Sequence, residues 1–271
     1  MRPLKGKPKP GHRSTKKRLL IFILIFILIL ILLLLIPPIL YMAYQGGVYM
    51  STRHSECYRP PNELCYTSAA TFCDMALIEL APSEIWPDLG VQLLDLALDP
   101  QNGKRVVIPG WKAGRTIATA ELLAKCPVVS QMYEDLERPL SRVIGERVSG
   151  TPLDLPTSCS LLVYEQTGDF INWHYDVNYF NGRFFTLLIP ITPDNTCTTY
   201  KHQASPTTEV IVRIPEGRAL LFEGEHVFHM ATPICEGQVR VILSMQFVTS
   251  RDVNTWKRLL MRVKDVAYVG L

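Results

Sequence analysis

Two short segments in the last third of the chain carry residue types that could hold a metal ion. His174 and Asp176 lie two positions apart in the first segment, and His229 in the second is followed eleven residues later by Arg240. Two imidazoles and a carboxylate on one face of a metal leave the opposite face open. This geometry suits non-haem Fe(II), which must also bind a cosubstrate and O₂.

Both segments must be extended for these side chains to meet. Residues two apart on a strand point the same way, so the first histidine and the aspartate can reach one metal together. His226 competes with His229 as the second histidine ligand; three residues apart on a strand, they face opposite sides and cannot easily both bind. Pro233 and Gly237 downstream favour His229, and we interpret His226 as a pocket-edge or structural histidine.

Arg240 begins an otherwise apolar segment and therefore needs a partner, since burying an unpaired charge is costly. Its planar guanidinium can form two parallel hydrogen bonds to the second carboxylate of a dicarboxylate cosubstrate. Ser244 and Tyr164 could add hydroxyl contacts to the same ligand. Arg183 and Arg218 are rival anchors, but each lies at a predicted turn, where we expect it to be exposed.

Hydrophobic periodicity divides the folded region into two halves. Residues 61–150 predict a mainly helical support region, with helices at 116–125 and 128–144, the second kinked or broken by Pro139. Residues 151–250 predict short strands separated by Gly-containing turns, which is typical of a sandwich or jelly roll. The expected strands are 160–166, 184–191, 209–214, 219–222, 227–232 and 239–249, followed by a C-terminal helix in 251–271.

The N-terminal region predicts a membrane anchor. Residues 1–18 carry eight Lys or Arg and no acid, and 19–36 are eighteen apolar residues, about 27 Å of helix at 1.5 Å per residue. The predicted span covers 19–44, and a stem follows at 45–60. Basic flanks stay cytoplasmic, which predicts a single-pass type II protein with its domain in the endoplasmic reticulum or Golgi lumen, or outside the cell. A cleaved signal peptide is the alternative, but this apolar run is longer than usual for one.

The charge and the cysteine content limit the binding partners and the cellular compartments that suit the chain. Beyond the basic tail, 20 basic residues stand against 25 acidic ones, so the folded portion is acidic and lacks the basic stripe of a nucleic-acid-binding protein. All seven cysteines follow the predicted span, where an oxidising lumen would permit disulfides. The odd count leaves at least one thiol unpaired or intermolecular, and the absence of a C-x-x-C pair argues against a zinc ribbon.

Short motifs around the candidate ligands occur in a characteristic order. They are Leu162-Val163-Tyr164, Gly168-Asp169-Phe170, His174-Tyr175-Asp176, Arg183-Phe184-Phe185-Thr186, Leu188-Ile189-Pro190, Gly217-Arg218-Ala219-Leu220-Leu221-Phe222, His229 with Pro233, Gly237 and Arg240. Over about residues 158–250 the chain resembles the Fe(II)/2-oxoglutarate-dependent dioxygenases. Within them it is most similar to the branch that contains the prolyl 4-hydroxylase catalytic domain.

The resemblance implies an α+β fold, with a double-stranded β-helix (jelly-roll) core and a helical support layer. It implies Fe(II) held by His174, Asp176 and His229, and 2-oxoglutarate that chelates the iron and pairs with Arg240. The expected reaction consumes O₂, decarboxylates 2-oxoglutarate to succinate and hydroxylates a C–H bond; ascorbate is a further candidate cofactor. Peptidyl Pro or Lys is the first candidate substrate, although collagen-type prolyl hydroxylases usually carry Lys where this chain has Arg240.

Two other functions are weighed against this one. The first is a catalytically silent, membrane-tethered binding or scaffold module on the same fold, which the intact ligand set disfavours. The second is a nucleic-acid demethylase, which the acidic folded portion and the predicted location across a membrane disfavour. Whether the substrate is a protein, a peptide or a small molecule, and the oligomeric state, are left open, because specificity lies in loops such as 192–208.

Overall fold

A computed structural model describes residues 20–31, 33, 75–79, 88–193, 200–205, 208–253 and 257. The chain divides into two compact units, 1–52 and 53–271. In the first unit, residues 20–31 form a helix with exposed Leu, Ile and Phe side chains. Within the described ranges, no helix combines the length and the apolar character needed to cross a bilayer. The anchor, the basic tail, the stem and the C-terminal helix extend over residues outside these ranges and stay predictions.

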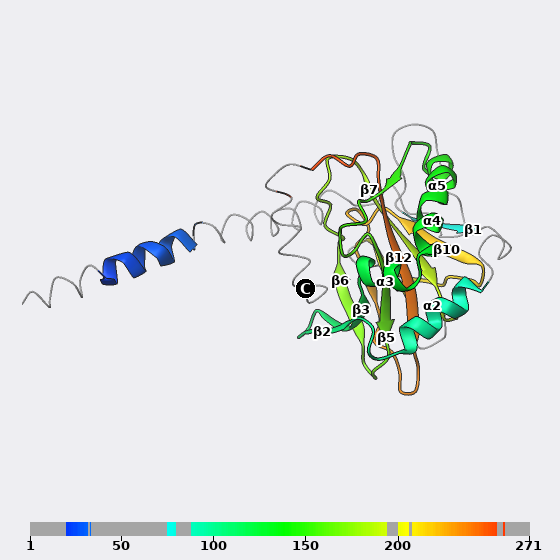
Figure 1. Cartoon of the computed structure of the whole chain (residues 1–271), viewed down its shortest axis with the longest axis horizontal. Helices are drawn as coiled ribbons and strands as arrows, with labels where there is room; N and C mark the ends of the chain where they lie inside the picture. Colours follow the sequence, from blue (N-terminus) through cyan, green and yellow to red (C-terminus); the bar gives the residue numbers. More distant parts are fainter. Residues whose placement is uncertain are drawn as a thin grey trace, which may run out of the picture. The chain divides into compact units, whose positions relative to one another are not determined.

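The second unit is built on one antiparallel sheet of twelve described strands. The strand order is β1-β10-β7-β12-β5-β3-β6-β11-β8-β9, with β2 paired to β3 and β4 paired to β12 (Figure 1). From β5 to β12 the chain crosses repeatedly between two halves of the sheet, one with β5, β7, β10 and β12 and the other with β6, β8, β9 and β11. Only β8 and β9 follow each other within one half, where they pair as a hairpin, and the whole is the jelly-roll arrangement. The strands are β1 (Met75–Glu79), β2 (Lys104–Ile108), β3 (Lys112–Ile117), β4 (Ser149–Gly150), β5 (Cys159–Tyr164), β6 (Phe170–His174), β7 (Phe184–Pro190), β8 (Tyr200–Ser205), β9 (Thr208–Val212), β10 (Arg218–Phe222), β11 (His229–Ala231) and β12 (Arg240–Val248).

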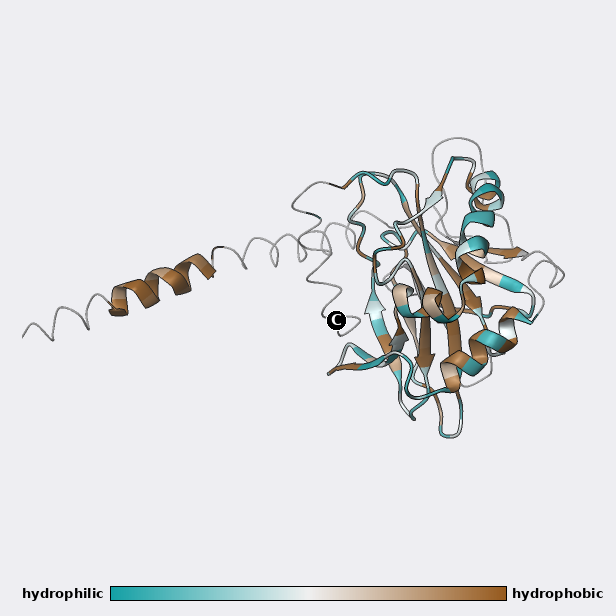
Figure 2. Cartoon of the chain, in the orientation of Figure 1, coloured by the Kyte–Doolittle hydropathy of each residue, from teal (hydrophilic) through white to brown (hydrophobic). Residues whose placement is uncertain are grey.

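Four helices cover one face of β5, β7 and β12. They are α2 (Leu89–Leu98), α3 (Thr119–Lys125), α4 (Val128–Asp135) and α5 (Glu137–Ile144). Successive strand residues point to opposite faces. On β12, Leu243 and Phe247 join the core cluster that includes Leu93 and Leu122 of the helices, whereas Ser244 lines a cavity on the other face. Figure 2 shows these strands hydrophobic over much of their length, while the helices also carry hydrophilic residues.

The break predicted at Pro139 is confirmed. Helices α4 and α5 meet at Leu136, and Pro139 lies in the first turn of α5, where its missing N–H costs no helical hydrogen bond. The helix predicted from residue 116 begins instead at Thr119, because Thr116 and Ile117 belong to β3.

The region predicted to be mainly helical, 61–150, also contains β1, β2, β3 and β4. The sequence does not predict β3, because its buried residues include Lys112, Arg115 and Thr116. The strand therefore lacks the alternation of polar and apolar residues that indicates a half-buried strand. The six predicted strands correspond to β5, β7, β9, β10, β11 and β12. Strands β6 and β8 were not predicted, because their sequences, FINWH and YKHQAS, mix polar and apolar residues without a regular period.

Candidate metal centre

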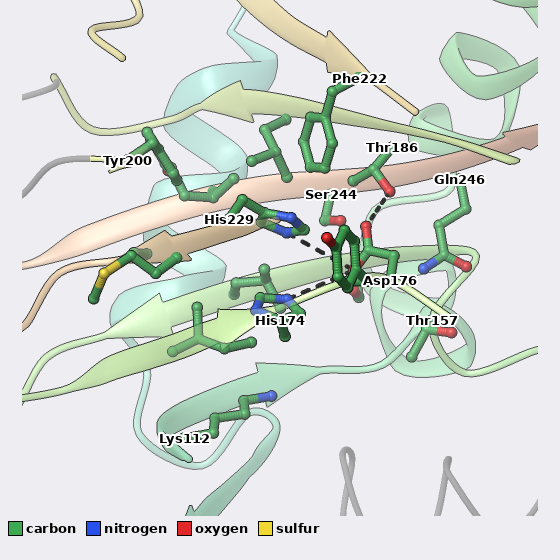
Figure 3. Close-up of a pocket in the computed structure, with 18 of the residues that line it drawn as sticks. Lys112, Thr157, His174, Asp176, Thr186, Tyr200, Phe222, His229, Ser244 and Gln246 are labelled. Atoms are coloured by element: carbon green, nitrogen blue, oxygen red, sulfur yellow. Dashed lines mark hydrogen bonds and ion pairs between the residues drawn. The ribbon is translucent and has the colours of Figure 1, made fainter. Parts of the chain in front are cut away.

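The structure brings the two histidines and the aspartate together at the ends of neighbouring strands. His174 ends β6 and His229 begins β11, and these two residues are direct partners across the pair. Their Nε2 atoms lie 3.6 and 3.9 Å from the same oxygen, Oδ1 of Asp176 (Figure 3). The three ligand atoms lie within 4.8 Å of one another, so a single metal ion could contact them all.

Backbone carbonyls set the orientation of both imidazoles. Nδ1 of each ring donates to the carbonyl two residues earlier, at 2.7 Å for His174 and 2.8 Å for His229. When such a ring is neutral its proton is on Nδ1, because the carbonyl can only accept, and the Nε2 lone pair faces the centre. Burial, followed by the charge of His229, lowers the pKa of His174 to about 4, so this ring is neutral near pH 7.

Asp176 is oriented by two groups that the sequence did not single out for this role. The Thr186 hydroxyl on β7 donates to Oδ2 at 2.6 Å, which leaves Oδ1 toward the histidines. The backbone N–H of Asp176 donates to the Gly224 carbonyl at 2.9 Å. A Cβ at Gly224 would overlap the Asp176 carboxylate, so this position requires glycine. The sequence marked residue 224 only as part of a turn.

The loop that carries Gly224 is anchored by a buried ion pair. Arg183 donates to both carboxylate oxygens of Glu223 at 3.1 and 2.9 Å, and Glu223 is 2% exposed. Although burial opposes its ionisation, hydrogen bonds from His226 and Arg183 hold the pKa of Glu223 below its ordinary value. Arg183 is therefore half-buried in an ion pair rather than exposed at a turn, and His226 has a structural contact as interpreted. Glu223, Glu225 and His226 also cluster, but the guanidinium already neutralises Glu223.

A cavity of about 130 Å³ adjoins the three ligands. Its walls come from both halves of the sheet and from β3. Figure 3 shows Lys112 and Ser244 in this cavity together with the metal ligands. The lining residues include Lys112, Thr116, Thr157, Ser160, Leu162, Tyr164, Ile171, Tyr175, Phe184, Leu188, Tyr200, Phe222, Ile242, Ser244 and Gln246. Tyr164 and Ser244, the predicted hydroxyl contacts, are thus in one cavity, and Lys112 is a charged lining residue that the sequence did not indicate.

Arg240 is a buried charge beside this cavity. It is 4% exposed, and its guanidinium carbon lies 4.3 Å from the ring centroid of Tyr164 and 5.6 Å from that of Tyr200. Nη2 donates to the Thr232 carbonyl at 3.4 Å, whereas Nε and Nη1 have no hydrogen-bond partner among the described residues. Leaving buried N–H groups unpaired is costly, so this site fits a carboxylate that could accept from them.

Comparison with solved structures identifies the class of fold. No family profile and no curated protein matches the sequence. Among solved structures, a 2OG-Fe(II) oxygenase family oxidoreductase from Burkholderia pseudomallei aligns with a TM-score of 0.52 at 9% identity, covering 67% of this chain and 88% of that chain. A prolyl hydroxylase from Trichoplax adhaerens, in complex with a peptide fragment of the hypoxia-inducible factor oxygen degradation domain, aligns with a TM-score of 0.50 at 13% identity (69% and 86%).

A third structure holds the ligands that the site suggests. The epimerase SnoN, in complex with Fe³⁺, alpha-ketoglutarate and nogalamycin RO, aligns with a TM-score of 0.50 at 12% identity, covering 65% of this chain and 79% of that chain. The chain therefore has the fold of the Fe(II)/2-oxoglutarate-dependent oxygenases. Within that class its fold is shared with a prolyl hydroxylase, in agreement with the motifs around His174 and His229.

Proposed function

We propose that the chain is an Fe(II)/2-oxoglutarate-dependent oxygenase that hydroxylates a C–H bond. One observation carries the proposal: a preoriented His174–Asp176–His229 set opens into the same cavity that Tyr164, in contact with buried Arg240, also lines. Two imidazole nitrogens and one carboxylate leave a face of the metal open, as the chemistry requires. Bound Fe(II) would supply activation of O₂, coupled to decarboxylation of 2-oxoglutarate to succinate and CO₂.

The chain's own residues bind the cosubstrate and exclude water. Nε and Nη1 of Arg240, the two guanidinium nitrogens without a partner among the described residues, would donate to the distal carboxylate of 2-oxoglutarate, with Tyr164 packed against the guanidinium. Between this end and the metal ligands the wall is apolar, with Leu162, Leu188 and Ile242 among its residues. Such a wall excludes bulk water and strengthens each polar contact inside.

A peptidyl substrate, with Pro or Lys as the hydroxylated residue, belongs to this proposal. Aromatic side chains surround the metal ligands: the ring centroid of Phe228 lies 5.4 Å from that of Trp173 and 4.9 Å from that of Tyr175. Val177, which also lines the cavity, is 43% exposed. An apolar rim of this kind suits a peptide side chain entering the cavity. The Trichoplax adhaerens structure, with its bound peptide, supports the same substrate class.

We also propose that the domain is lumenal or extracellular on a type II anchor. The basic tail and the apolar run favour this orientation. Cys235 is disulfide-bonded, which supports an oxidising compartment. Sealed microsomes test the orientation, because the domain should resist added protease until detergent opens the vesicles. Digestion without detergent would contradict it.

The purified full-length protein tests the activity. We expect stoichiometric iron and uncoupled formation of succinate from 2-oxoglutarate, and we expect His174→Ala and Asp176→Ala to lose both while remaining folded. Asp154→Ala, which removes an exposed carboxylate that belongs neither to the ligand set nor to the cavity lining, is the matched control. Full turnover in the two ligand variants would refute the site, and bound iron without any turnover would favour the silent module.

A further inference from the structure

Strand β3 is inserted between β5 and β6, which are consecutive in sequence, and pairs with both. It therefore forms part of the cavity wall. Lys112 and Thr116, four positions apart on this strand, both line the cavity. Lys112 is 5% exposed and Thr116 is 2% exposed, so a positive charge is buried in the wall.

The ammonium group of Lys112 lies between the two ends of the cavity. Lys112 is opposite Ile171 on β6, three residues before the ligand His174. Its Nζ lies 3.3 Å from Oγ1 of Thr116, so the side chain runs along β3 past Gly114. Thr116 is opposite Leu162 on β5, whereas Arg240 is opposite Tyr164, two residues further along the same strand. The ammonium is thus offset from the Arg240 end toward the metal ligands.

Lys112 places a positive charge in the wall of the cavity that the proposed metal ligands also line. A buried ammonium attracts an anion that enters the same cavity, because charges are weakly screened in the interior. The ligand proposed for this cavity is a dianion, and Arg240 accounts for only its distal carboxylate. Lys112 is too deeply buried to meet a substrate at the rim, which leaves the other end of the 2-oxo acid.

We infer that Lys112, with the hydroxyl of Thr116, binds the metal-side carboxylate of the 2-oxo acid. This inference rests on the proposed function, since it needs a 2-oxo acid as cosubstrate. Lys112 is then a positioning residue: its charge holds the carboxylate that is bonded to the ketone carbon. The cavity would thus fix both ends of the dianion, one with a guanidinium and one with an ammonium.

Two 2-oxo acids of equal chain length distinguish the contributions of the two carboxylates to binding. 2-Oxoglutarate has both, whereas 2-oxopentanoate lacks the distal one. Each is titrated without oxygen into the Fe(II)-loaded full-length protein, and binding is read from the visible charge-transfer band of the iron–2-oxo acid chelate, with no turnover. We expect Lys112→Met to weaken both ligands by a similar factor, about 10- to 100-fold. Arg240→Met should weaken 2-oxoglutarate alone.

Matched variants keep the result interpretable. Lys104→Met removes an exposed lysine of β2 and should leave both affinities unchanged. Thr116→Val should weaken both ligands less than Lys112→Met does, and it provides the same comparison if Lys112→Met does not fold. Iron stoichiometry is measured for each variant.

Two results would overturn this inference and leave the proposed function standing. If Lys112→Met weakens only 2-oxoglutarate, Lys112 serves the distal carboxylate beside Arg240. If neither affinity changes, Lys112 does not contact the 2-oxo acid. A wild-type protein that binds iron but neither ligand would instead refute the proposed function, and the inference with it.

Discussion

At the scale of single residues, Asp176 is the proposed metal ligand whose orientation is fixed by the most contacts. Its Oδ2 accepts from Thr186, its N–H donates to Gly224, and its Oδ1 is left for the metal. A carboxylate without these contacts could rotate, and removing an outer partner of a metal ligand typically costs 10- to 100-fold in metal affinity or activity.

Thr186→Val should therefore weaken Fe(II) or Mn(II) binding by about 10-fold, because the valine keeps the shape but not the donor. Thr186→Ser keeps the hydroxyl and should retain most of the affinity. Anaerobic metal titration of both variants measures the effect. Equal affinities for wild type and Thr186→Val would show that the hydrogen bond does not orient the carboxylate.

Spacing along the chain singles out Arg240 and the three proposed ligands, which the structure brings together, but not the residues that orient them. The ligands form local motifs with fixed offsets. The partners are joined by pairings across the sheet: Thr186 meets Asp176 from another strand, and Lys112 reaches the cavity from the other half of the chain. Such contacts leave no periodic signal in a single sequence.

At the scale of elements, the loop between β10 and β11 connects a buried ion pair to the metal centre. Glu223 is held by Arg183, and the next residue, Gly224, lies against Asp176. Removing the guanidinium would leave a buried carboxylate with fewer donors, which is costly.

Arg183→Met should lower the free energy of unfolding by about 1–3 kcal/mol and weaken metal binding. Urea denaturation of the metal-free and metal-loaded protein separates the two effects. Arg138→Met, which removes an exposed arginine of α5, is the control. Unchanged metal affinity in a destabilised Arg183→Met would mean that the ion pair supports the fold without orienting the ligand.

Sequence periodicity identified the apolar strands of the core but not the polar ones. Strand β12 is buried on both faces and six of its nine residues are apolar, so the sequence predicts it directly. Strand β3 buries Lys112, Arg115 and Thr116, and Arg115 is balanced by Glu165 at 2.6 and 2.8 Å. Tertiary partners of this kind decide whether a polar segment becomes a buried strand, and no local pattern records them.

At the scale of the whole molecule, the redox state of the cysteines tests the proposed lumenal or extracellular location. Cys235 is disulfide-bonded, whereas Cys126 and Cys159 are buried thiols whose pKa is raised by burial. Under non-reducing conditions, alkylation followed by peptide mapping should label Cys126 and Cys159 only after unfolding, and Cys235 only after reduction. Labelling of Cys235 without a reductant would argue against the disulfide and weaken the case for a lumenal domain.

The insertion of β3 between β5 and β6 also limits how the chain can be divided. All the motif residues lie beyond residue 150, which suggests that residues 151–250 could fold and act alone. However, β3, the strand that joins the two halves of the sheet, precedes residue 151 in the sequence. A fragment starting at 151 would expose facing edges of β5 and β6, and unpaired strand edges associate with other chains. We therefore expect a chain truncated at that boundary to aggregate, so both halves must be kept together in any shortened version of the protein.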